Sequence, residues 1–314
     1  SAIPKRSEYA YIVQKMNDAV VSASSQSRDS TDESLYLQFH ESFITEPVEM
    51  LELDRSKNRL LALHPHHGFV SNFAIRADNF KVDRSVQAWL LTATSLAVND
   101  EFVVFLTNPY GKLVKANRRG QVLDQYEIWH RYLTSLVLTG NYIFVTDRRN
   151  DVIIQFDMSK PMSEESSLLI GRGFLHRPLS ASVLMSTFLV AVQNDGRVIV
   201  FHLETGFRLT SFAEDIPMIG EVTIQAEDTH KTVLLSKEME KSLDVYCFCG
   251  YRRRLQHGQK VPRFCLALRL GLSFSPYCSV YSPEMQIIYL LERREKVKSQ
   301  VHAFRLNLQP LNHI

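Results

Sequence analysis

Cysteine, glycine and the short motifs of common enzymes are all scarce in this sequence. Four cysteines in 314 residues are too few for a disulfide scaffold, and no two of them form a C-x-x-C pair. With only 12 glycines, the chain carries no phosphate-binding loop, dinucleotide fingerprint, nucleophile elbow or zincin helix. We therefore expect reduced thiols, no cofactor and no enzymatic activity.

An excess of one charge and a long apolar run are also missing. The 36 basic and 34 acidic side chains leave a formal net charge of +2, so attraction to nucleic acid or lipid would have to come from local patches. The longest uncharged stretch, Pro178–Asn194, is shorter than the roughly 20 apolar residues of a membrane-spanning helix. Neither a signal peptide nor an Asn-x-Ser/Thr sequon is present. These features predict an intracellular protein, cytoplasmic or nuclear, without a membrane span.

Short runs of β-branched and aromatic residues, separated by turn residues, follow one another along the whole chain. They occur in sets of four, as between Thr134 and Gly171 and again between Ser180 and Phe212. Within these sets Asn150-Asp151 and Asn194-Asp195-Gly196 separate the second and third runs, where a hairpin needs residues that tolerate positive φ. Each set is typical of four antiparallel strands joined by tight turns.

The sets recur with a period of about 40 to 45 residues, which is the length of a propeller blade. Second strands are expected near residues 19, 60, 103, 143, 188, 232 and 287, and Leu35–His40 is the expected third strand of the first set. An insertion at residues 250–263 lengthens the sixth set. The pattern predicts seven blades within a single domain, residues 1–314. For ring closure, either Gln309–Ile314 or Ile3–Arg6 could supply the missing outer strand of the last blade.

Two segments resemble the strand ends of WD40 repeats. Gln155-Phe156-Asp157-Met158 and the run from Val200 to Gly206 stand where that family has its Trp-Asp dipeptide and the turn that follows. The chain has no Trp-Asp and no blade with Gly-His, so the resemblance rests on period and pattern. It implies an all-β, seven-bladed β-propeller of four-stranded antiparallel blades. A pair of β-sandwiches or a barrel is the competing fold, but two sandwiches have no reason to share one period.

Basic side chains gather on one predicted rim, formed by the turns between second and third strands and by the connections between blades. Arginine pairs there suit bidentate recognition of carboxylate or phosphate groups, although solvated surface arginines are the alternative. Some propellers of the resembled family, including receptors of F-box ubiquitin ligases, read degrons with such a rim. The candidate partner-binding residues are Arg131, Arg148, Arg149, Arg177, Arg293, Arg294 and Lys296.

Three other groups of residues are candidates for binding. Arg252, Arg253 and Arg254 lie in the insertion, which we expect to be a mobile loop on the opposite rim, suited to nucleic acid or partner docking. His64, His66 and His67 could bind zinc or copper with distant partners, although a solvated turn is the simpler interpretation. Cys247 and Cys249 are expected to be inert buried thiols, and Trp89 and Trp129 to be structural, with an exposed interface anchor as the alternative.

The sequence therefore predicts a non-enzymatic interaction scaffold, or a module that recognises substrates or adaptors within a larger complex. The expected partner is a protein, with an acidic or phosphorylated peptide as the segment read by the basic rim. A propeller that binds nucleic acid through its basic loops is the alternative. We expect no resident metal.

Overall fold

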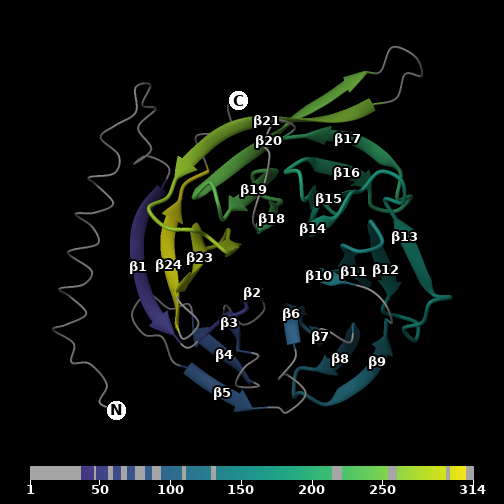
Figure 1. Ribbon diagram of the computed structural model, residues 1–314, viewed down its shortest axis with the longest axis horizontal. Coiled ribbons are helices and arrows are strands. Elements are labelled where there is room, and N and C mark those ends of the chain that lie inside the picture. The colour runs from purple at the N-terminus through teal and green to yellow at the C-terminus, as the bar shows by residue number, and fades with distance from the viewer. Residues whose placement is uncertain are drawn as a thin grey trace.

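The fold is a ring of β-sheets. The computed structural model describes residues 37–45, 47–55, 59–64, 69–74, 82–86, 93–107, 111–128, 132–213, 221–253, 260–294 and 298–308. These residues form 24 strands in six four-stranded antiparallel sheets, the blades. Figure 1 shows the blades around a central axis, with β10, β14 and β18 near the centre and β5, β9, β13 and β17 at the circumference. No helix of the described residues is long and apolar enough to cross a membrane.

The first three blades run from the innermost to the outermost strand in chain order. The first blade comprises β2 (Met50–Asp54), β3 (Arg59–His64), β4 (Phe69–Ala74) and β5 (Val82–Val86). The second comprises β6 (Ala93–Val98), β7 (Phe102–Thr107), β8 (Lys112–Asn117) and β9 (Val122–Glu127). The third comprises β10 (Leu133–Thr139), β11 (Tyr142–Asp147), β12 (Val152–Asp157) and β13 (Ser167–Ile170).

The fourth and fifth blades keep this order, whereas the outermost strand of the sixth blade is β1, from the beginning of the described chain. The fourth comprises β14 (Pro178–Leu184), β15 (Phe188–Gln193), β16 (Val198–His202) and β17 (Arg208–Phe212). The fifth comprises β18 (Val222–Glu227), β19 (Thr232–Lys237), β20 (Ser242–Arg253) and β21 (Lys260–Gly271). The sixth comprises β22 (Cys278–Ser282), β23 (Ile287–Arg294), β24 (Lys298–Leu306) and β1 (Leu37–Thr45).

Each pair of neighbouring blades shares its own apolar core. Six clusters of buried side chains are present among the described residues, one at each junction, including the junction between the sixth and first blades. At that junction Leu51 and Leu60 pack with Tyr289 and Val301. Because both faces of a blade are covered, the middle strands β15 and β19 are buried along their whole length. The inner strands also contact one another around the full ring, from β2 to β22 and back to β2.

The expected propeller of four-stranded antiparallel blades is confirmed, but the expected number of seven blades is wrong for the described chain. Six of the seven expected second strands coincide with β3, β7, β11, β15, β19 and β23, and the one near residue 19 lies outside the described residues. The run Leu35–His40, expected to be the third strand of an additional first blade, instead overlaps β1, which pairs with β24. The sequence of a strand does not show which strand it pairs with, so the strand that closes the ring was counted as part of an extra blade. Gln309–Ile314 and Ile3–Arg6, the two segments expected to close the ring, lie outside the described residues, and Leu37–Thr45 occupies the outer position of the last blade.

Polar side chains of the inner strands bind the backbone of the next blade. Ser135 Oγ accepts from the Ala181 amide at 3.2 Å, and Ser182 Oγ accepts from the Ala226 amide at 2.9 Å. In the same direction around the ring, Gln225 Oε1 accepts from the Tyr281 amide at 2.6 Å. Edge amides that would be unpaired at the ring's centre are thus satisfied, which fixes the position of one blade against the next.

The expected mobile loop at residues 250–263 is in part regular structure. β20 continues to Arg253 and β21 begins at Lys260, so both strands extend beyond the rest of the fifth blade. We call the paired segments Cys249–Arg253 and Lys260–Phe264 the arm. Figure 1 shows the far ends of β20 and β21 projecting past the circumference beside β17. Phe248 and Phe264, at the base of the arm, pack on Phe188 and Phe212 of the fourth blade, with ring centroids 6.2 and 4.7 Å apart. Aromatic packing therefore orders a segment whose polar sequence is typical of a loop.

Candidate functional site

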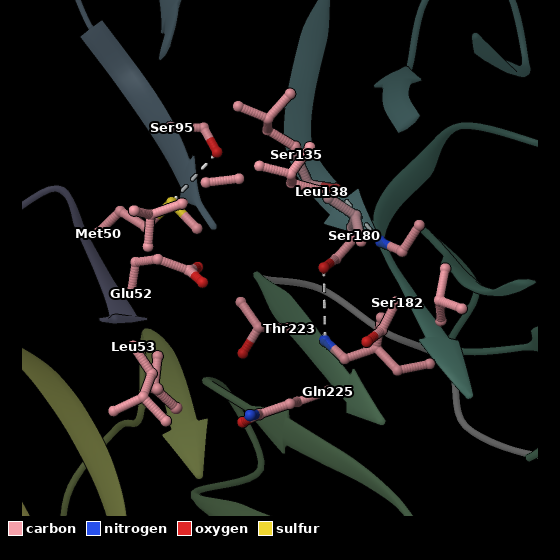
Figure 2. A pocket seen from close by; sticks show the side chains of 18 of the residues that line it. Met50, Glu52, Leu53, Ser95, Ser135, Leu138, Ser180, Ser182, Thr223 and Gln225 are labelled. Atoms are coloured by element: carbon pink, nitrogen blue, oxygen red, sulfur yellow. Dashed lines mark hydrogen bonds between the residues drawn. The ribbon is translucent and has the colours of Figure 1, made fainter. Parts of the chain in front are cut away.

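A central cavity of about 800 Å³ runs between the inner strands, and all six blades contribute to its wall. Figure 2 shows its polar lining, with the side chain of Glu52 directed into the space from β2. A polar residue of each inner strand lines the cavity: Glu52, Ser95, Ser135, Ser180, Thr223 and Ser279. Several of these hydroxyls are held in place, since Ser95 Oγ donates to the Met50 sulfur at 3.1 Å and the hydroxyls of Thr223 and Ser279 are 3.4 Å apart.

Glu52 is the one charged side chain at the middle of an inner strand. It is partly exposed to the cavity, and burial raises its pKa to about 8, although the charge of Arg55 acts in the opposite direction. The structure gives its carboxylate no ion pair and no side-chain hydrogen bond within the described chain. Glu52 was not among the residues predicted from the sequence. The signal that could have found it is the polar position that recurs once in every inner strand.

Three of the predicted rim arginines, Arg148, Arg149 and Arg177, lie at one rim of the ring, over the third and fourth blades. There the start of each inner strand lies beside the end of the second strand, as the pairs Leu133–Asp147 and Pro178–Gln193 show. Asp147 accepts hydrogen bonds from the amides of Arg149 and Asn150 and shapes the turn. Asp151 and Gly196 adopt φ of 57° and 79°, which confirms the expected positive-φ turns.

Arg148 and Arg177 connect these two blades. The Arg148 guanidinium lies 6.0 Å from the centre of the exposed Tyr132 ring and donates to Asn194 Oδ1 at 3.1 Å. The Arg177 amide donates to Asp151 Oδ1 at 2.6 Å, and its carbonyl accepts from the Asn194 amide at 3.1 Å. These contacts join the turn of the third blade, the turn of the fourth blade and the connection between the two blades, so the three segments form one continuous surface.

We call this surface the rim patch. Arg149 and Arg177 are exposed, and Arg148 is half-buried. Arg197 belongs to the patch but was not predicted; it lies at the turn of the fourth blade, with Nε 4.0 Å from an Asp195 carboxylate oxygen. The members are Tyr132, Arg148, Arg149, Arg177 and Arg197. Four guanidinium groups against the carboxylates of Asp147, Asp151 and Asp195 leave the patch with a net positive charge.

Arg293, also predicted as a rim residue, lies near the end of the second strand of the sixth blade, where its guanidinium is already paired. It lies within β23, and its guanidinium forms a 2.6 Å ion pair with Glu49 of the first blade and lies over the Tyr277 ring. Arg294 ends β23, and nothing further is described of its side chain. Arg131 and Lys296 lie outside the described residues. The structure therefore brings together Arg148, Arg149 and Arg177, and places Arg293 at the junction that closes the ring.

The second predicted basic cluster lies on the arm. Arg252 is exposed in β20, Arg253 is the last residue of that strand, and Arg254 lies outside the described residues. Lys260 and Arg263 of β21 are also exposed. Residues 249–263 contain five basic residues and no acidic ones. The cluster is thus presented by a β-hairpin and not by the expected irregular loop.

The histidine turn does not have the predicted structure. His64 is the last residue of β3, is buried, and has Nδ1 3.0 Å from the Pro47 carbonyl oxygen. It was expected in an exposed turn from Leu63 to Gly68, but β3 continues through His64, whose side chain is buried. His66 and His67 lie outside the described residues, as do Trp89 and Trp129. No group of three metal-binding side chains occurs among the residues described.

Three of the four thiols meet on one strand pair. Cys247 lies opposite Cys265, and all four cysteines are free. Cys247 is buried as expected, but Cys249 is only half-buried. Burial raises the pKa values of both thiols to about 11, and the neighbouring Cys265 acts in the same direction. Thiols with such pKa values are poor nucleophiles near neutral pH.

Comparison with known proteins shows the fold alone. No family model and no curated protein matches the chain. Among solved structures, a chain of the "Crystal Structure of Mitotic Checkpoint Complex" matches with a TM-score of 0.59 and 11% identity, over 83% of this chain and 75% of that one. The "RRP9 WD40 repeats" match with a TM-score of 0.57 and "U3-55K" with 0.56, both at 11% identity. They cover 83% and 82% of this chain, and 80% of each of those chains. The chain thus has the fold of WD40 propellers, and its function has to be argued from its own surfaces.

Proposed function

We propose that this propeller is a non-enzymatic interaction module whose rim patch binds an acidic or phosphorylated segment of a protein partner. The observation that carries the proposal is the gathering of four arginines on ordered turns over two adjacent blades. The Arg148 guanidinium is held by Asn194, and the backbone of Arg177 is held by Asp151 and Asn194, so little ordering of the turns remains for binding. Planar guanidinium groups bind carboxylate and phosphate in a bidentate manner.

The rim patch also carries an exposed aromatic ring. Tyr132 is 53% exposed and contacts the Arg148 guanidinium, so an apolar contact stands directly beside the positive charge. Tyrosine and arginine are the residue types enriched at interface hot spots. The solved propellers that match this chain include one from a crystal structure of a multiprotein complex, which supports a role for this chain as a scaffold in an assembly. The absence of enzymatic activity and the intracellular location stay predictions.

The proposal is tested with an array of phosphorylated, acidic and neutral peptides of equal length, with binders then measured by fluorescence anisotropy. We expect phosphorylated or acidic peptides to bind the native protein and the double variant Arg149→Ala/Arg177→Ala to lose at least tenfold in affinity. The matched control is Arg252→Ala/Arg263→Ala, which removes the same charge from the arm and should change affinity less than threefold. Equal losses in both variants, or no preference for anionic peptides, would refute rim recognition.

A second candidate function is binding to the phosphate backbone of nucleic acid through the arm. The observation that favours it is that residues 249–263 contain five basic and no acidic residues, and that the described part of this segment forms the paired strands of the arm, anchored by aromatic packing. Exposed Tyr251 adds a ring on which a base can stack. Binding of a labelled single-stranded RNA should weaken steeply with salt, and Arg252→Ala/Arg263→Ala should flatten that dependence. A rim variant that has the same effect would argue against the arm.

A further inference from the structure

The wall of the central cavity has a charge opposite to that of the rim patch. Seven carboxylate side chains line it, against two arginines, and the described lining contains no lysine or histidine. The members with charge are Glu49, Glu52, Asp54, Asp100, Glu101, Glu221, Asp228, Arg55 and Arg148. An anionic segment bound at the rim patch would therefore not be drawn further into the channel, whereas a cation would be.

These charges are distributed unevenly along the channel. Glu49 and Glu221 precede inner strands at one mouth, while Asp100 and Glu101 lie in the turn before β7 and Asp228 lies in the turn after β18, at the other mouth. Glu49 is paired with Arg293, and Asp54 is paired with Arg118. Glu52 stands between the two mouths, and its carboxylate has no such partner within the described chain. A cation that enters either mouth thus meets one unpaired carboxylate at mid-depth.

The surroundings of Glu52 define which cation fits. The hydroxyls of Ser95, Ser180 and Thr223 line the same cavity, and Figure 2 shows them around the space into which Glu52 points. Protein sites for Ca²⁺ gather six or more oxygen ligands, usually with several carboxylates, and the mid-depth wall offers only one carboxylate. A primary ammonium has three tetrahedral donors, which one carboxylate and two hydroxyl oxygens from different strands can satisfy. The cavity volume of about 800 Å³ is within the range of small-molecule sites.

We propose that the central channel binds a primary aliphatic ammonium group, with the Glu52 carboxylate as its counter-ion and the inner-strand hydroxyls as further acceptors. The same chemistry is carried by a free polyamine and by the side chain of a lysine in a partner's tail. Tyr132 and Arg148 of the rim patch also line one mouth of the channel, but Glu52 lies at mid-depth and the rim patch recognises the opposite charge. Failure of either proposal therefore leaves the other intact.

Protonation of Glu52 opposes binding, because an uncharged carboxyl no longer attracts the ammonium. The titratable and charged groups near Glu52 are Asp54 and Arg55 on its own side of the channel and Cys278 on β22. Burial is the larger influence and holds the pKa of Glu52 at about 8. Affinity for an ammonium ligand should therefore rise about tenfold per pH unit from pH 6 toward pH 8 and then level off. Aliphatic ammonium groups keep their charge over this range.

The test is isothermal titration calorimetry of the full chain at pH 8.5 with three probes. These are spermidine, a short peptide with one lysine, and the same peptide with that lysine acetylated. We expect spermidine or the lysine peptide to bind and the acetylated peptide not to bind. Tighter binding of spermidine would identify a free polyamine as the source of the ammonium group, and tighter binding of the peptide a partner's lysine. If neither ammonium probe binds, the proposal is wrong.

The variant that decides the role of Glu52 is Glu52→Gln, which keeps the shape of the side chain. It should weaken binding at least tenfold and remove the pH dependence. Thr223→Val should weaken binding about threefold through loss of one acceptor. Glu101→Gln removes the same charge at the channel mouth and should change affinity less than threefold. Equal effects of Glu52→Gln and Glu101→Gln would show a general electrostatic attraction and would overturn the assignment of Glu52. Melting curves establish that each variant is folded.

Discussion

The Arg293 guanidinium carbon lies 3.3 Å from the centre of the Tyr277 ring. Both residues belong to the last part of the chain, yet the same guanidinium is 2.6 Å from a carboxylate oxygen of Glu49, which precedes β2. Burial raises the pKa of the Tyr277 hydroxyl, and the charge of Glu49 acts in the same direction, so this ring stays neutral. The cluster therefore joins the sixth blade to the first, at the junction where the ring closes.

Loss of this cluster should weaken ring closure. Arg293→Gln and Glu49→Gln should each lower the free energy of unfolding, and a double-mutant cycle should give a coupling of up to about 1 kcal/mol, because the pair is partly exposed. The ring contact with Tyr277 is lost in both Arg293 variants and adds only to the effect of Arg293→Gln. Chemical denaturation measures all four proteins. Arg149→Gln, on the exposed rim patch, serves as the control and should be neutral within about 0.5 kcal/mol. A coupling near zero would show that Arg293 does not contribute to closure.

A buried ion network in the fifth blade should be far more sensitive. Lys237 and Asp244 are 1% and 0% exposed, and their charged atoms are 2.6 Å apart. Asp244→Asn leaves the Lys237 ammonium buried without its main counter-ion and should cost about 3–5 kcal/mol of unfolding free energy. Arg269 also binds Asp244, but its side chain is 50% exposed, so Arg269→Gln should cost no more than about 1 kcal/mol. Urea denaturation compares the two, and similar losses would contradict this account.

Strands and their order in the blade could be predicted from the sequence because they follow from local composition. The run Thr232–Lys237 became β19, which is buried throughout, and Val152–Asp157 became β12 as expected. Closure could not be predicted in the same way. β1 and β24 pair across some 250 residues, and nothing in the run Leu37–Thr45 distinguishes a closing outer strand from a strand within its own blade.

The positions of candidate binding residues could be predicted only where the residues lie in a hairpin turn that the local sequence specifies. Arg148 and Arg149 follow Asp147, whose side chain caps the turn, so their place on a rim follows from the hairpin itself. The pairing of Arg293 with Glu49 could not be predicted, because it depends on which blades become neighbours. The strands of the arm could not be predicted from its own polar sequence, which is typical of a loop. Their order comes from packing on Phe188 and Phe212 of another blade.

The thiols of the fifth and sixth blades should react slowly in the folded protein. Burial raises the pKa values of Cys247 and Cys278 to about 11, so at pH 8 roughly one molecule in a thousand carries each thiolate. Alkylation by iodoacetamide at pH 8, followed by mass spectrometry of the peptides, should label these two residues at least a hundredfold more slowly in the native state than in urea. Rapid native labelling of Cys278 would show that the junction between the sixth and first blades opens readily.

The carboxyl group of Glu52 should make the stability of the protein depend on pH. Its pKa is about 8 in the folded chain and 4.5 for an ordinary glutamate, so between these values the folded state holds a proton that the unfolded state has released. Stability contributed by this proton is fully present below pH 4.5 and is lost as the pH rises through 8.

Replacement of Glu52 by Gln removes that titration, because the amide stays neutral at every pH. The melting temperature of Glu52→Gln should therefore exceed that of the native protein by an amount that grows from pH 5 to pH 8.5 and then stays constant. Differential scanning calorimetry at a series of pH values measures this difference, in which the titration of all other groups cancels. Glu101→Gln, an exposed residue at the channel mouth, should show no such trend. Parallel melting profiles for the native protein and Glu52→Gln would mean that the Glu52 carboxylate is well solvated in the channel, with a pKa near that of an ordinary glutamate.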